Sequence, residues 1–565
     1  MSSNSADFRK TTWKARPAIS AKSSPLLIAK LLDRGVRIAG DEKVVTVGAF
    51  GVHTQTYAET RARACQLAHA LSALGISRGD RVATLMWNGH RHLEAFYGVP
   101  AMGAVLHTIN MRLAPSEIEY VINHAEDRLF LVDEDLLPML MPMLERLSSV
   151  RHMVIASTGG DWKKQLPDAL DWEEMIADGP SDYDWPTLDE DAPHGLCYTS
   201  GTTGNPKGVI HTHRSTYLHT MVQAMTDVVG LTATDCILQV VPMCHVWGWG
   251  YPFTATMLGA RQIMVHGSWK PDFLLDLIER EKITFSSGVP TIWQTVRAAI
   301  EAEPNRWDLS ALERINCGAA APPASLIRWY WDHLDIEMIH SWGMTETNPL
   351  GATSRRLAKR KHLELGLDEQ LGNMAKTGLP LPGLEIKIAD DDGRPLPNDG
   401  ETVGNLLVRG PWVCSEYYGD PLPERFPDGW LHTGDLAKID PEHYLIISDR
   451  SKDLIKSGGE WISSIDVENH IVAMPGVLKA AVVGQPHPKW GERPVALVEL
   501  KPGATLKAEQ VIDHCASKFA SWQLPDDVLF MDSMPLNSTG KLDKQAIREH
   551  LDTDGYLLPD LRGTG

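Results

Sequence analysis

Residues 198–209 read YTSGTTGNPKGV and follow the apolar residues 195–197. The stretch holds glycines, four Ser or Thr side chains and one lysine, Lys207. Glycines let backbone amides approach an oxyanion, hydroxyls donate further hydrogen bonds, and a lysine supplies a positive charge. The spacing is not the Walker pattern, because Lys207 neither directly follows a glycine nor precedes Ser or Thr. We therefore predict a polyphosphate-binding loop; a plain surface linker would not need the lysine.

The chain is long and acidic. It has 565 residues, with 54 Lys and Arg against 73 Asp and Glu, a formal net charge of −19. A single core stops growing at about 250–300 residues, so at least two domains are expected. General nucleic-acid binders need clustered basic residues, so the acidic balance argues against that class. The basic run 355–361 is predicted to be a solvated face.

The order of apolar and helical patterns predicts the fold class. Across residues 81–132, buried strand patterns alternate with helical ones, which is typical of an α/β protein with parallel sheet. Short strands near 403–409 and 444–447 indicate a smaller β-rich section. Beyond Arg450, the patterns predict a compact α+β unit with helices near 465–473 and 508–519.

Residues 236–260 contain no Asp, Glu, Lys or Arg and are long enough to span a membrane. Pro242, Pro252 and His245 interrupt them, so we expect a buried strand, a loop and a helix around a pocket instead. Residues 1–23 lack the apolar core of a secretory signal and are expected to form a flexible tail, with a targeting role left open. Seven cysteines without a CxxC pair indicate a reducing compartment, and we expect the cytoplasm.

Six motifs in order resemble those of the adenylate-forming superfamily, which contains acyl-CoA synthetases, luciferases and peptide-synthetase adenylation domains. Within that superfamily, residues 83–110 and 486–494 look most like bacterial medium- and long-chain fatty acyl-CoA synthetases and their methylthio-alkanoate relatives. The motifs are YTSGTTGNPKGV, CGAAAP at 317–322, HSWGMTET at 340–347, LHTGDL at 431–436, DRSKDLIKSGGEWISS at 449–464 and NSTGK at 537–541.

The resemblance implies a fold and a reaction. A large N-terminal ATP- and acyl-binding domain would span residues 24–450, and a small mobile C-terminal domain residues 451–565. A carboxylate would attack ATP to give an acyl-adenylate and pyrophosphate, and coenzyme A would then displace AMP to give a thioester. ATP, Mg²⁺, coenzyme A and a carboxylic acid are the implied ligands, most simply a medium- to long-chain fatty acid.

The resemblance also implies which residues bind the nucleotide. The phosphate loop would use its backbone and hydroxyls, a turn and a tryptophan would enclose adenine, and a carboxylate and an arginine would hold the ribose. Many relatives carry tyrosine at the tryptophan position, a departure that could alter nucleotide affinity. The residues are Thr199, Ser200, Gly201, Thr202, Thr203, Gly204 and Lys207 for phosphate; Gly318, Ala319, Ala320 and Trp342 for adenine; and Asp435 and Arg450 for ribose.

Catalytic, hinge, coenzyme A and acyl positions follow from the same resemblance. Glu346 would hold Mg²⁺, Thr345 would meet the α-phosphate, and Lys541 would bridge the substrate carboxylate and the α-phosphate. Lys452 would be the hinge of the C-terminal domain. His245 would be a further catalytic residue, at the gate of the acyl pocket. The coenzyme A residues would be Gly458, Gly459, Glu460 and Trp461, and the acyl pocket would comprise Trp247, Trp249, Gly288, Val289 and Pro290.

Several alternatives stay open at this stage. The substrate could be a short or substituted acid, such as a methylthio-alkanoate or an aryl acid, or the enzyme could load a carrier protein. A luciferase-like oxygenase shares the first half-reaction, but no feature specifically demands oxygen. An inactive binding descendant is disfavoured because the charged motif residues are all present. No fixed basic residue of the predicted acyl pocket is suited to bind a second substrate carboxylate, which favours a monocarboxylic acid. A homodimer is left open.

Overall fold

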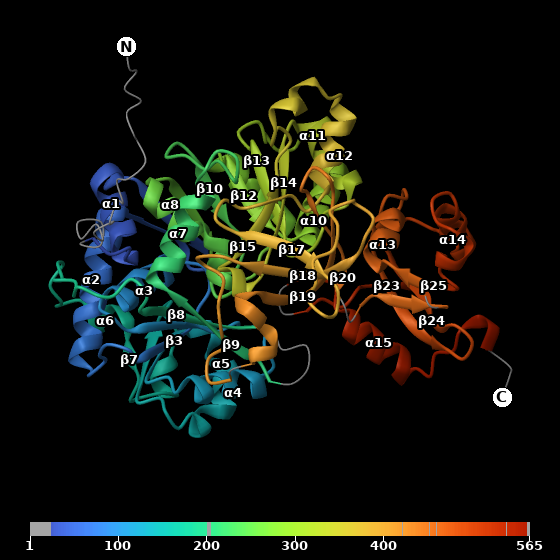
Figure 1. Cartoon of the computed structure of the whole chain (residues 1–565). Coiled ribbons are helices and arrows are strands. Elements are labelled where there is room, and N and C mark those ends of the chain that lie inside the picture. Colours follow the sequence, from blue (N-terminus) through green and yellow to red (C-terminus); the bar gives the residue numbers. More distant parts are fainter. Residues whose placement is uncertain are drawn as a thin grey trace, which may run out of the picture.

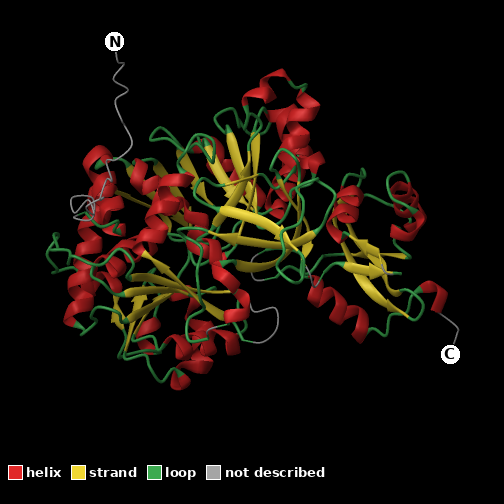
Figure 2. Ribbon diagram, in the orientation of Figure 1, coloured by secondary structure: helices red, strands yellow, loops and turns green. Residues whose placement is uncertain are grey.

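The structure is a computed structural model that describes residues 24–199, 205–420, 422–450, 453–458, 460–537 and 540–561. The described residues form four sheets. Helices cover the two large sheets, while the sheet of β23 to β25 lies with α13, α14 and α15 at one side of the molecule (Figures 1 and 2). This arrangement confirms the predicted α/β class with a β-rich section and a small α+β unit.

The first large sheet has seven strands in the order β7-β6-β5-β3-β4-β8-β9. All neighbouring pairs are parallel except β8 and β9, which form an antiparallel hairpin. Its strands are β3 (Arg81–Leu85), β4 (Val105–Thr108), β5 (Leu129–Asp133), β6 (His152–Ala156), β7 (Leu170–Asp171), β8 (Pro193–Thr199) and β9 (Lys207–Thr212).

The second large sheet has nine strands in the order β16-β15-β14-β13-β12-β10-β11-β1-β2. Its middle is parallel, and antiparallel strands close both edges. The strands are β1 (Lys43–Gly48), β2 (Gly51–Thr56), β10 (Cys236–Gln239), β11 (Arg261–Val265), β12 (Phe285–Gly288), β13 (Arg314–Gly318), β14 (Glu337–Gly343), β15 (Leu350–Ser354) and β16 (Leu379–Pro380).

Helices follow the strands of both sheets, as right-handed crossovers between parallel strands require. The helix that spans residues 115–125 begins at Pro115, where proline is tolerated because the first helical N–H has no intrahelical partner. The helices are α1 (Ile28–Ala39), α2 (Tyr57–Ala73), α3 (His90–Ala101), α4 (Pro115–Ala125), α5 (Leu137–Leu140), α6 (Trp172–Ile176), α7 (His213–Gln223), α8 (Tyr251–Leu258), α9 (Pro271–Arg280), α10 (Pro290–Ala302), α11 (Ala324–Leu334) and α12 (Leu367–Ala375).

The β-rich section is a four-stranded antiparallel sheet in the order β17-β18-β19-β20. An apolar cluster that includes Trp342 and Leu406 packs this sheet against the end of β14. Its strands are β17 (Glu385–Ala389), β18 (Gly404–Arg409), β19 (Leu431–Ile439) and β20 (Leu445–Arg450).

The residues after Arg450 form their own sheet and core. The core packs α13 and α14 on one face of the sheet and α15 on the other. The elements are β21 (Ile455–Ser457), β22 (Glu460–Ile462), α13 (Ser464–Val472), β23 (Val477–His487), β24 (Gly491–Leu500), α14 (Ala508–Ala516), β25 (Asp527–Met531) and α15 (Lys544–Thr553).

Residues 236–260 fold as a buried strand, a turn and a helix, as predicted. They form β10, the short helical turn Val246–Gly250 and α8, and all of these are buried. Among the helices of the described residues, none is long and apolar enough to cross a membrane.

The basic run 355–361 is tied to the fold more closely than a solvated face would be. Arg355 forms an ion pair with Glu337 at 2.7 Å, and both side chains are largely buried. Lys359 pairs with Glu442 at 3.0 Å, and Lys361 contacts the same carboxylate. These acidic partners are distant in sequence, which is why the local pattern did not indicate them.

Candidate active site

The parallel strands of the nine-stranded sheet bring three predicted site segments to one edge. Gly288 pairs with Cys317 across β12 and β13, and Gly318 pairs with Ser341 across β13 and β14. Trp342 is the next residue of β14 after Ser341. Ligands of open α/β sheets bind outside the carboxyl ends of the strands, so this edge is the expected binding side.

Gly318 has no room for a side chain at this edge. A Cβ there would lie 2.9 Å from the Ser341 carbonyl oxygen and 3.4 Å from the Trp249 ring. The next residue, Ala319, has a φ of 69°. The tight approach of Trp249 joins the predicted adenine turn to the predicted acyl pocket.

The phosphate loop connects the antiparallel strands β8 and β9. Thr199 and Lys207 pair across the hairpin, so their side chains lie on the same face of it. Ser200, Gly201, Thr202, Thr203 and Gly204, which the motif also assigns to phosphate binding, lie outside the described residues.

Tyr417 links the phosphate loop to the predicted metal ligand. The Lys207 ammonium lies 5.3 Å from the centre of the Tyr417 ring. The Tyr417 hydroxyl donates a hydrogen bond of 2.8 Å to Oε1 of Glu346. The neighbouring backbone N–H of Tyr418 bonds to the Gly208 carbonyl at 2.8 Å. Sequence reasoning missed Tyr417, because it lies about 70 residues from Glu346 and belongs to none of the quoted motifs.

Glu346 suits a hard cation. It lies in the short turn Thr345–Thr347 that follows β14, and only 4% of its surface is exposed. Burial raises the pKa of its carboxyl, while the hydrogen bond from Tyr417 opposes that shift. Mg²⁺ is commonly held by one or two carboxylates together with substrate phosphate oxygens. A buried carboxylate oriented by a tyrosine beside the phosphate loop fits that donor set.

A buried relay fixes the backbone of Thr345. Nε2 of His211 lies 2.9 Å from the Thr345 carbonyl oxygen, so this nitrogen carries the proton. Nδ1 of His211 accepts a bond from the Trp247 indole, which requires the neutral ring. Burial agrees with this, because it lowers the pKa of His211 to about 4. His211, itself held by Trp247, therefore fixes the backbone carbonyl of Thr345.

Asp435, Arg450 and Trp342 meet where the β-rich sheet adjoins β14. Asp435 pairs with Arg450 across β19 and β20, and the guanidinium Nε lies 3.7 Å from Asp435 Oδ1. The Trp342 indole N–H donates a bond of 2.8 Å to Oδ2 of the same carboxylate. The indole therefore orients the predicted ribose-binding carboxylate, a contact that the motif alone did not indicate.

Lys541 reaches this cluster from the C-terminal unit. The Gly540 carbonyl accepts a 3.0 Å hydrogen bond from the Thr291 hydroxyl of α10. Burial and the Arg450 guanidinium lower the pKa of Lys541 to about 7, and Asp435 opposes this shift. Nearby positive charges disfavour the charged form of a lysine, and a bound anion would offset them. The surroundings of Lys541 therefore favour an anionic ligand.

His245 and Arg112 lie at the same place. Burial, together with the positive charges of Lys541 and Arg112, lowers the pKa of His245 to about 4, so its ring is neutral at pH 7. The Arg112 guanidinium also approaches Gly540, since a Cβ there would lie 3.5 Å from its Nη1. Arg112 is a basic group near the acyl site that sequence analysis did not identify.

The predicted acyl residues separate into two groups. Trp249, Val289 and neighbouring apolar residues share one buried cluster, and Pro290 begins α10 beside it. Gly288 faces Trp293, with 3.1 Å between a Cβ position and the indole nitrogen. Trp247 instead packs against Phe96 and Phe253 in the core between the sheets.

The predicted coenzyme A segment is a hairpin between β21 and β22. Gly458 has a φ of 62°, which favours glycine, and its N–H bonds to the Trp490 carbonyl at 2.8 Å. Glu460 is exposed, and 52% of Trp461 is exposed. Among the described contacts none joins this hairpin to Lys541. Gly459 and the predicted hinge Lys452 lie outside the described residues.

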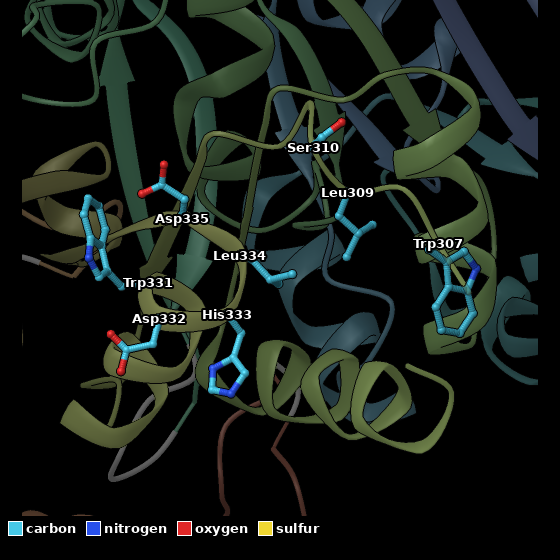
Figure 3. A pocket seen from close by; sticks show the side chains of 8 residues that line it. All are labelled: Trp307, Leu309, Ser310, Trp331, Asp332, His333, Leu334 and Asp335. Atoms are coloured by element: carbon cyan, nitrogen blue, oxygen red, sulfur yellow. The ribbon is translucent and has the colours of Figure 1, made fainter. Parts of the chain in front are cut away.

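A recess of about 600 Å³ lies elsewhere, between the end of α11 and the turn at residues 307–310 (Figure 3). None of the predicted site residues lines it. The candidate active site is therefore the edge where the phosphate hairpin, Glu346, the Asp435 pair and Lys541 converge.

A phosphate hairpin, a buried carboxylate and a lysine delivered from a second unit define a nucleotide-dependent enzyme. Residues 33–418 match the model of the AMP-binding enzyme family, and residues 466–541 match that of the AMP-binding enzyme C-terminal domain. The chain belongs to the AMP-binding enzyme family, which confirms the resemblance to adenylate-forming ligases.

Relatives of known name agree with this membership. The chain is 42% identical to a 3-methylmercaptopropionyl-CoA ligase of Ruegeria lacuscaerulensis, over 93% of this chain and 97% of the relative. It is also 42% identical to a medium-chain-fatty-acid–CoA ligase of Ectopseudomonas oleovorans, over 93% and 96%. The crystal structure of an anthranilate CoA ligase in complex with anthranoyl-AMP superposes with a TM-score of 0.85 at 26% identity, covering 95% of this chain and 100% of that one.

Proposed function

We propose that this protein is an AMP-forming acid–thiol ligase that converts a carboxylate, ATP and coenzyme A into an acyl-CoA, AMP and pyrophosphate. The observation that carries the proposal is the position of Lys541, next to the Gly540 carbonyl that is bonded to Thr291, where its charge interacts with Asp435, Arg450 and His245. A single ammonium there can serve the nucleotide and the acyl group together.

In the first half-reaction, the acid's carboxylate oxygen forms a bond to the α-phosphorus of ATP as the bond to pyrophosphate breaks. Lys541 is proposed to neutralise charge on the carboxylate and on the α-phosphate oxygens as it develops. Thr199 and Lys207 would hold the outer phosphates, and Thr345 the α-phosphate. Mg²⁺, held by Glu346, would neutralise phosphate charge when bound.

The nucleoside would be held by residues already oriented by the fold. Asp435 is proposed to accept hydrogen bonds from the ribose hydroxyls, as a carboxylate can, with its position fixed by Trp342 and Arg450. Gly318, Ala319 and Ala320, together with the face of Trp342, are proposed to enclose adenine.

In the second half-reaction, the thiol sulfur bonds to the acyl carbon while the bond to AMP breaks. We propose that residues 451–565 turn about Lys452 between the steps, withdrawing Lys541 and presenting Gly458, Gly459, Glu460 and Trp461 to the pantetheine arm. Such domain alternation lets one site serve two chemistries.

The acid is proposed to be an apolar monocarboxylate, with medium- to long-chain fatty acids as the first choice. The apolar cluster around Trp249 and Val289 supports this choice. Two relatives are named for 3-methylmercaptopropionyl-CoA, so a short thioether acid is the alternative. A panel of fatty, thioether, aryl and dicarboxylic acids, assayed for AMP release with ATP and coenzyme A, tests both. No AMP release with any acid would refute the proposal.

Two further assignments belong to this proposal. The proposed compartment is the cytoplasm. All seven cysteines are free thiols within the described residues, which is usual where thiols are kept reduced. The assembly is proposed to be a homodimer, which light scattering of the full chain tests directly.

Changing Tyr417 to phenylalanine should weaken the response to Mg²⁺. The substitution removes the hydrogen bond to Glu346 and keeps the ring under Lys207. Loss of a partner that orients a metal ligand typically costs about 10–100-fold in metal affinity. We expect the Mg²⁺ concentration for half-maximal pyrophosphate exchange to rise by about tenfold. Tyr418→Phe is the matched control, and an equal rise there would contradict the role of Tyr417.

Changing Trp249 to alanine should shift the preference for acyl chain length. Its ring is 6% exposed and lies in the apolar cluster beside Val289. A change of one methylene group in a fitted apolar pocket alters selectivity by about 10–200-fold. We expect the ratio of the kcat/KM values for long and short acids, measured from butanoate to hexadecanoate, to differ at least tenfold between the variant and the wild type. A profile of unchanged shape would contradict the gating role.

A further inference from the structure

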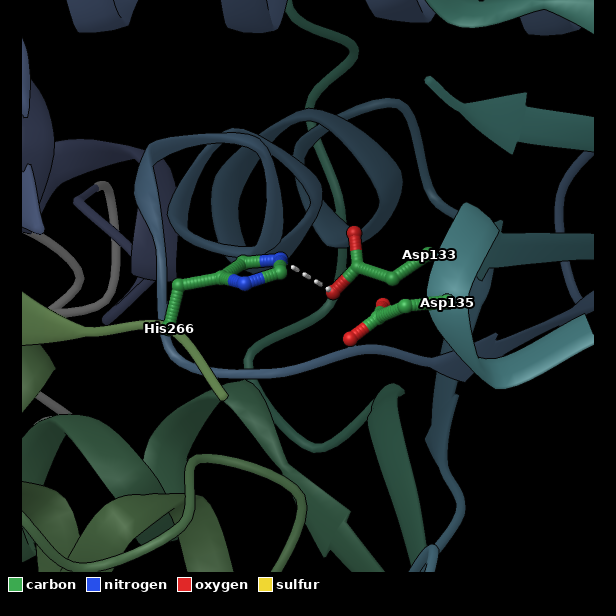
Figure 4. Close-up of side chains that lie close together, drawn as sticks. All are labelled: Asp133, Asp135 and His266. Carbon is green, nitrogen blue, oxygen red and sulfur yellow. Dashed lines mark ion pairs between the residues drawn. The ribbon is translucent and has the colours of Figure 1, made fainter. Parts of the chain in front are cut away.

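Three metal-binding side chains lie together away from the candidate active site. Asp133 ends β5 of the seven-stranded sheet, Asp135 follows in the next turn, and His266 follows β11 of the nine-stranded sheet. One ligand atom from each lies within 4.8 Å of the others. Figure 4 shows the His266 ring and the two carboxylates converging on one point. The cluster therefore joins the carboxyl ends of strands in two different sheets.

We propose that Asp133, Asp135 and His266 form a binding site for a divalent transition-metal ion of the Zn²⁺ type. Imidazole and carboxylate ligands suit such ions, and three protein ligands leave a position for water. The ion would connect the two large sheets. Nothing in the proposed ligase reaction requires it.

The ligand spacing matches a metal better than a direct ion pair. Nε2 of His266 lies 3.3 Å from Oδ2 of Asp133. Charge-assisted bonds between such groups are usually about 2.7–2.9 Å long. Ligands at zinc bond lengths of about 2.0–2.1 Å in a tetrahedral site are separated by about 3.3 Å. The observed distance between His266 and Asp133 therefore leaves room for both to bind one ion.

Both carboxylates are held by one residue, Trp87. Its backbone N–H donates a 2.7 Å bond to Oδ2 of Asp133, and its indole N–H donates a 2.9 Å bond to Oδ2 of Asp135. Metal-ligating carboxylates are typically oriented by such outer hydrogen bonds. Trp87 lies two residues after the end of β3, which pairs with β5, so the sheet itself aligns donor and acceptors.

The two carboxylates lack a permanent cation. Within the described residues, no Lys or Arg side chain forms an ion pair with Asp133 or Asp135, although Asp133 is 3% exposed. A divalent ion would compensate both carboxylates.

The test is Co²⁺ binding to the full-length protein after treatment with a chelator, without ATP. We expect about one Co²⁺ per chain with the visible spectrum of a four- or five-coordinate ion. His266→Ala and Asp135→Asn should each weaken binding at least tenfold, and Trp87→Phe, which removes the indole donor and keeps an aromatic ring, by about tenfold. ZnCl₂ should raise the thermal midpoint of the wild type and not that of His266→Ala.

Two controls separate this site from others. His333→Ala, which removes a histidine from α11, should bind Co²⁺ as the wild type does. Glu346→Gln should also retain the signal, because Glu346 belongs to the proposed Mg²⁺ site. Binding unchanged in both His266→Ala and Asp135→Asn, a signal lost in Glu346→Gln, or a spectrum of free aqueous Co²⁺ with the wild type would each overturn the proposal. If His266→Ala does not fold, Asp135→Asn, at an exposed side chain, decides alone.

Discussion

Lys541→Ala should slow adenylate formation by about 10²–10³-fold while leaving thioester formation from a supplied acyl-adenylate largely intact. The Gly540–Thr291 hydrogen bond holds this lysine beside Asp435 and Arg450, where its charge would meet the reacting carboxylate and α-phosphate. Removing one preorganised donor from a developing oxyanion typically costs about 10²–10³-fold in rate. We expect a loss of that size in carboxylate-dependent pyrophosphate exchange.

Lys501→Ala is the matched control for this experiment. Lys501 also belongs to the C-terminal unit and contacts the larger part of the chain, through an ion pair of 3.0 Å with Glu301. It is not part of the Lys541 cluster, so its loss should leave pyrophosphate exchange within about twofold, as expected for an exposed pair. If Lys541→Ala slowed both half-reactions equally, the proposal that this lysine acts only in adenylation would be contradicted.

The pH dependence of adenylation should report the same lysine. Its pKa of about 7 means that the charged form decreases as the pH rises through 7. Because the charged form is the one that binds anions, pyrophosphate exchange at low ATP should fall as the pH rises from 7 to 9. An arginine keeps its charge across that range, so Lys541→Arg should be slower but without this decline.

The fold and much of the site followed from local sequence, because their signals are local. The alternation of strands and helices in residues 81–132 and the position of Pro115 fix elements that need few distant contacts. The motif residues Glu346 and Asp435 could be named because each lies in a short stretch of recognisable chemistry. Their roles stay predictions, as do the domain limits at residues 24–450 and 451–565.

The residues that support the site could not be found in this way. Tyr417 orients Glu346, and His211 fixes Thr345, across separations of 71 and 134 residues. Arg112 reaches Gly540 only because the C-terminal unit packs on the larger part of the chain. Such pairs are set by sheet order and packing, which residue spacing does not encode. The Asp133 cluster, whose third member lies in another sheet, is a further case.

Lys544→Met should destabilise the C-terminal unit by about 3–5 kcal/mol, the usual cost of removing one partner from a buried ion pair. The Lys544 ammonium lies 2.8 Å from Oε1 of Glu468, and the exposed fractions of the two side chains are only 12% and 13%. It also stabilises the charge of Asp449, the buried carboxylate of β20 that accepts a bond from the Ser464 N–H. Methionine has a similar length and no charge, so both carboxylates would lose their cation.

The stability that Lys544→Met loses relative to the wild type should increase with pH. Burial raises the pKa of Glu468 to about 7. An acid whose folded-state pKa is raised destabilises the fold as the pH rises from its unfolded value through its folded value. Without Lys544 that pKa rises further, so the destabilisation relative to the wild type should grow between pH 6 and pH 8. Lys544→Met combined with Glu468→Gln, which removes the unpaired charge, should recover most of the stability.

Hydrogen exchange measures this loss where it occurs, since unfolding of a long chain with several units need not be two-state. Peptides covering α13 and β23 should exchange roughly 10²–10³-fold faster in Lys544→Met at pH 8, and peptides of the seven-stranded sheet should not change. The charge network also ties β20 to α15, the helix that begins three residues after Lys541. Adenylation should therefore slow in the single variant and recover in the double one. Unchanged protection of α13 at pH 8 would show that the ion pair contributes little to this unit.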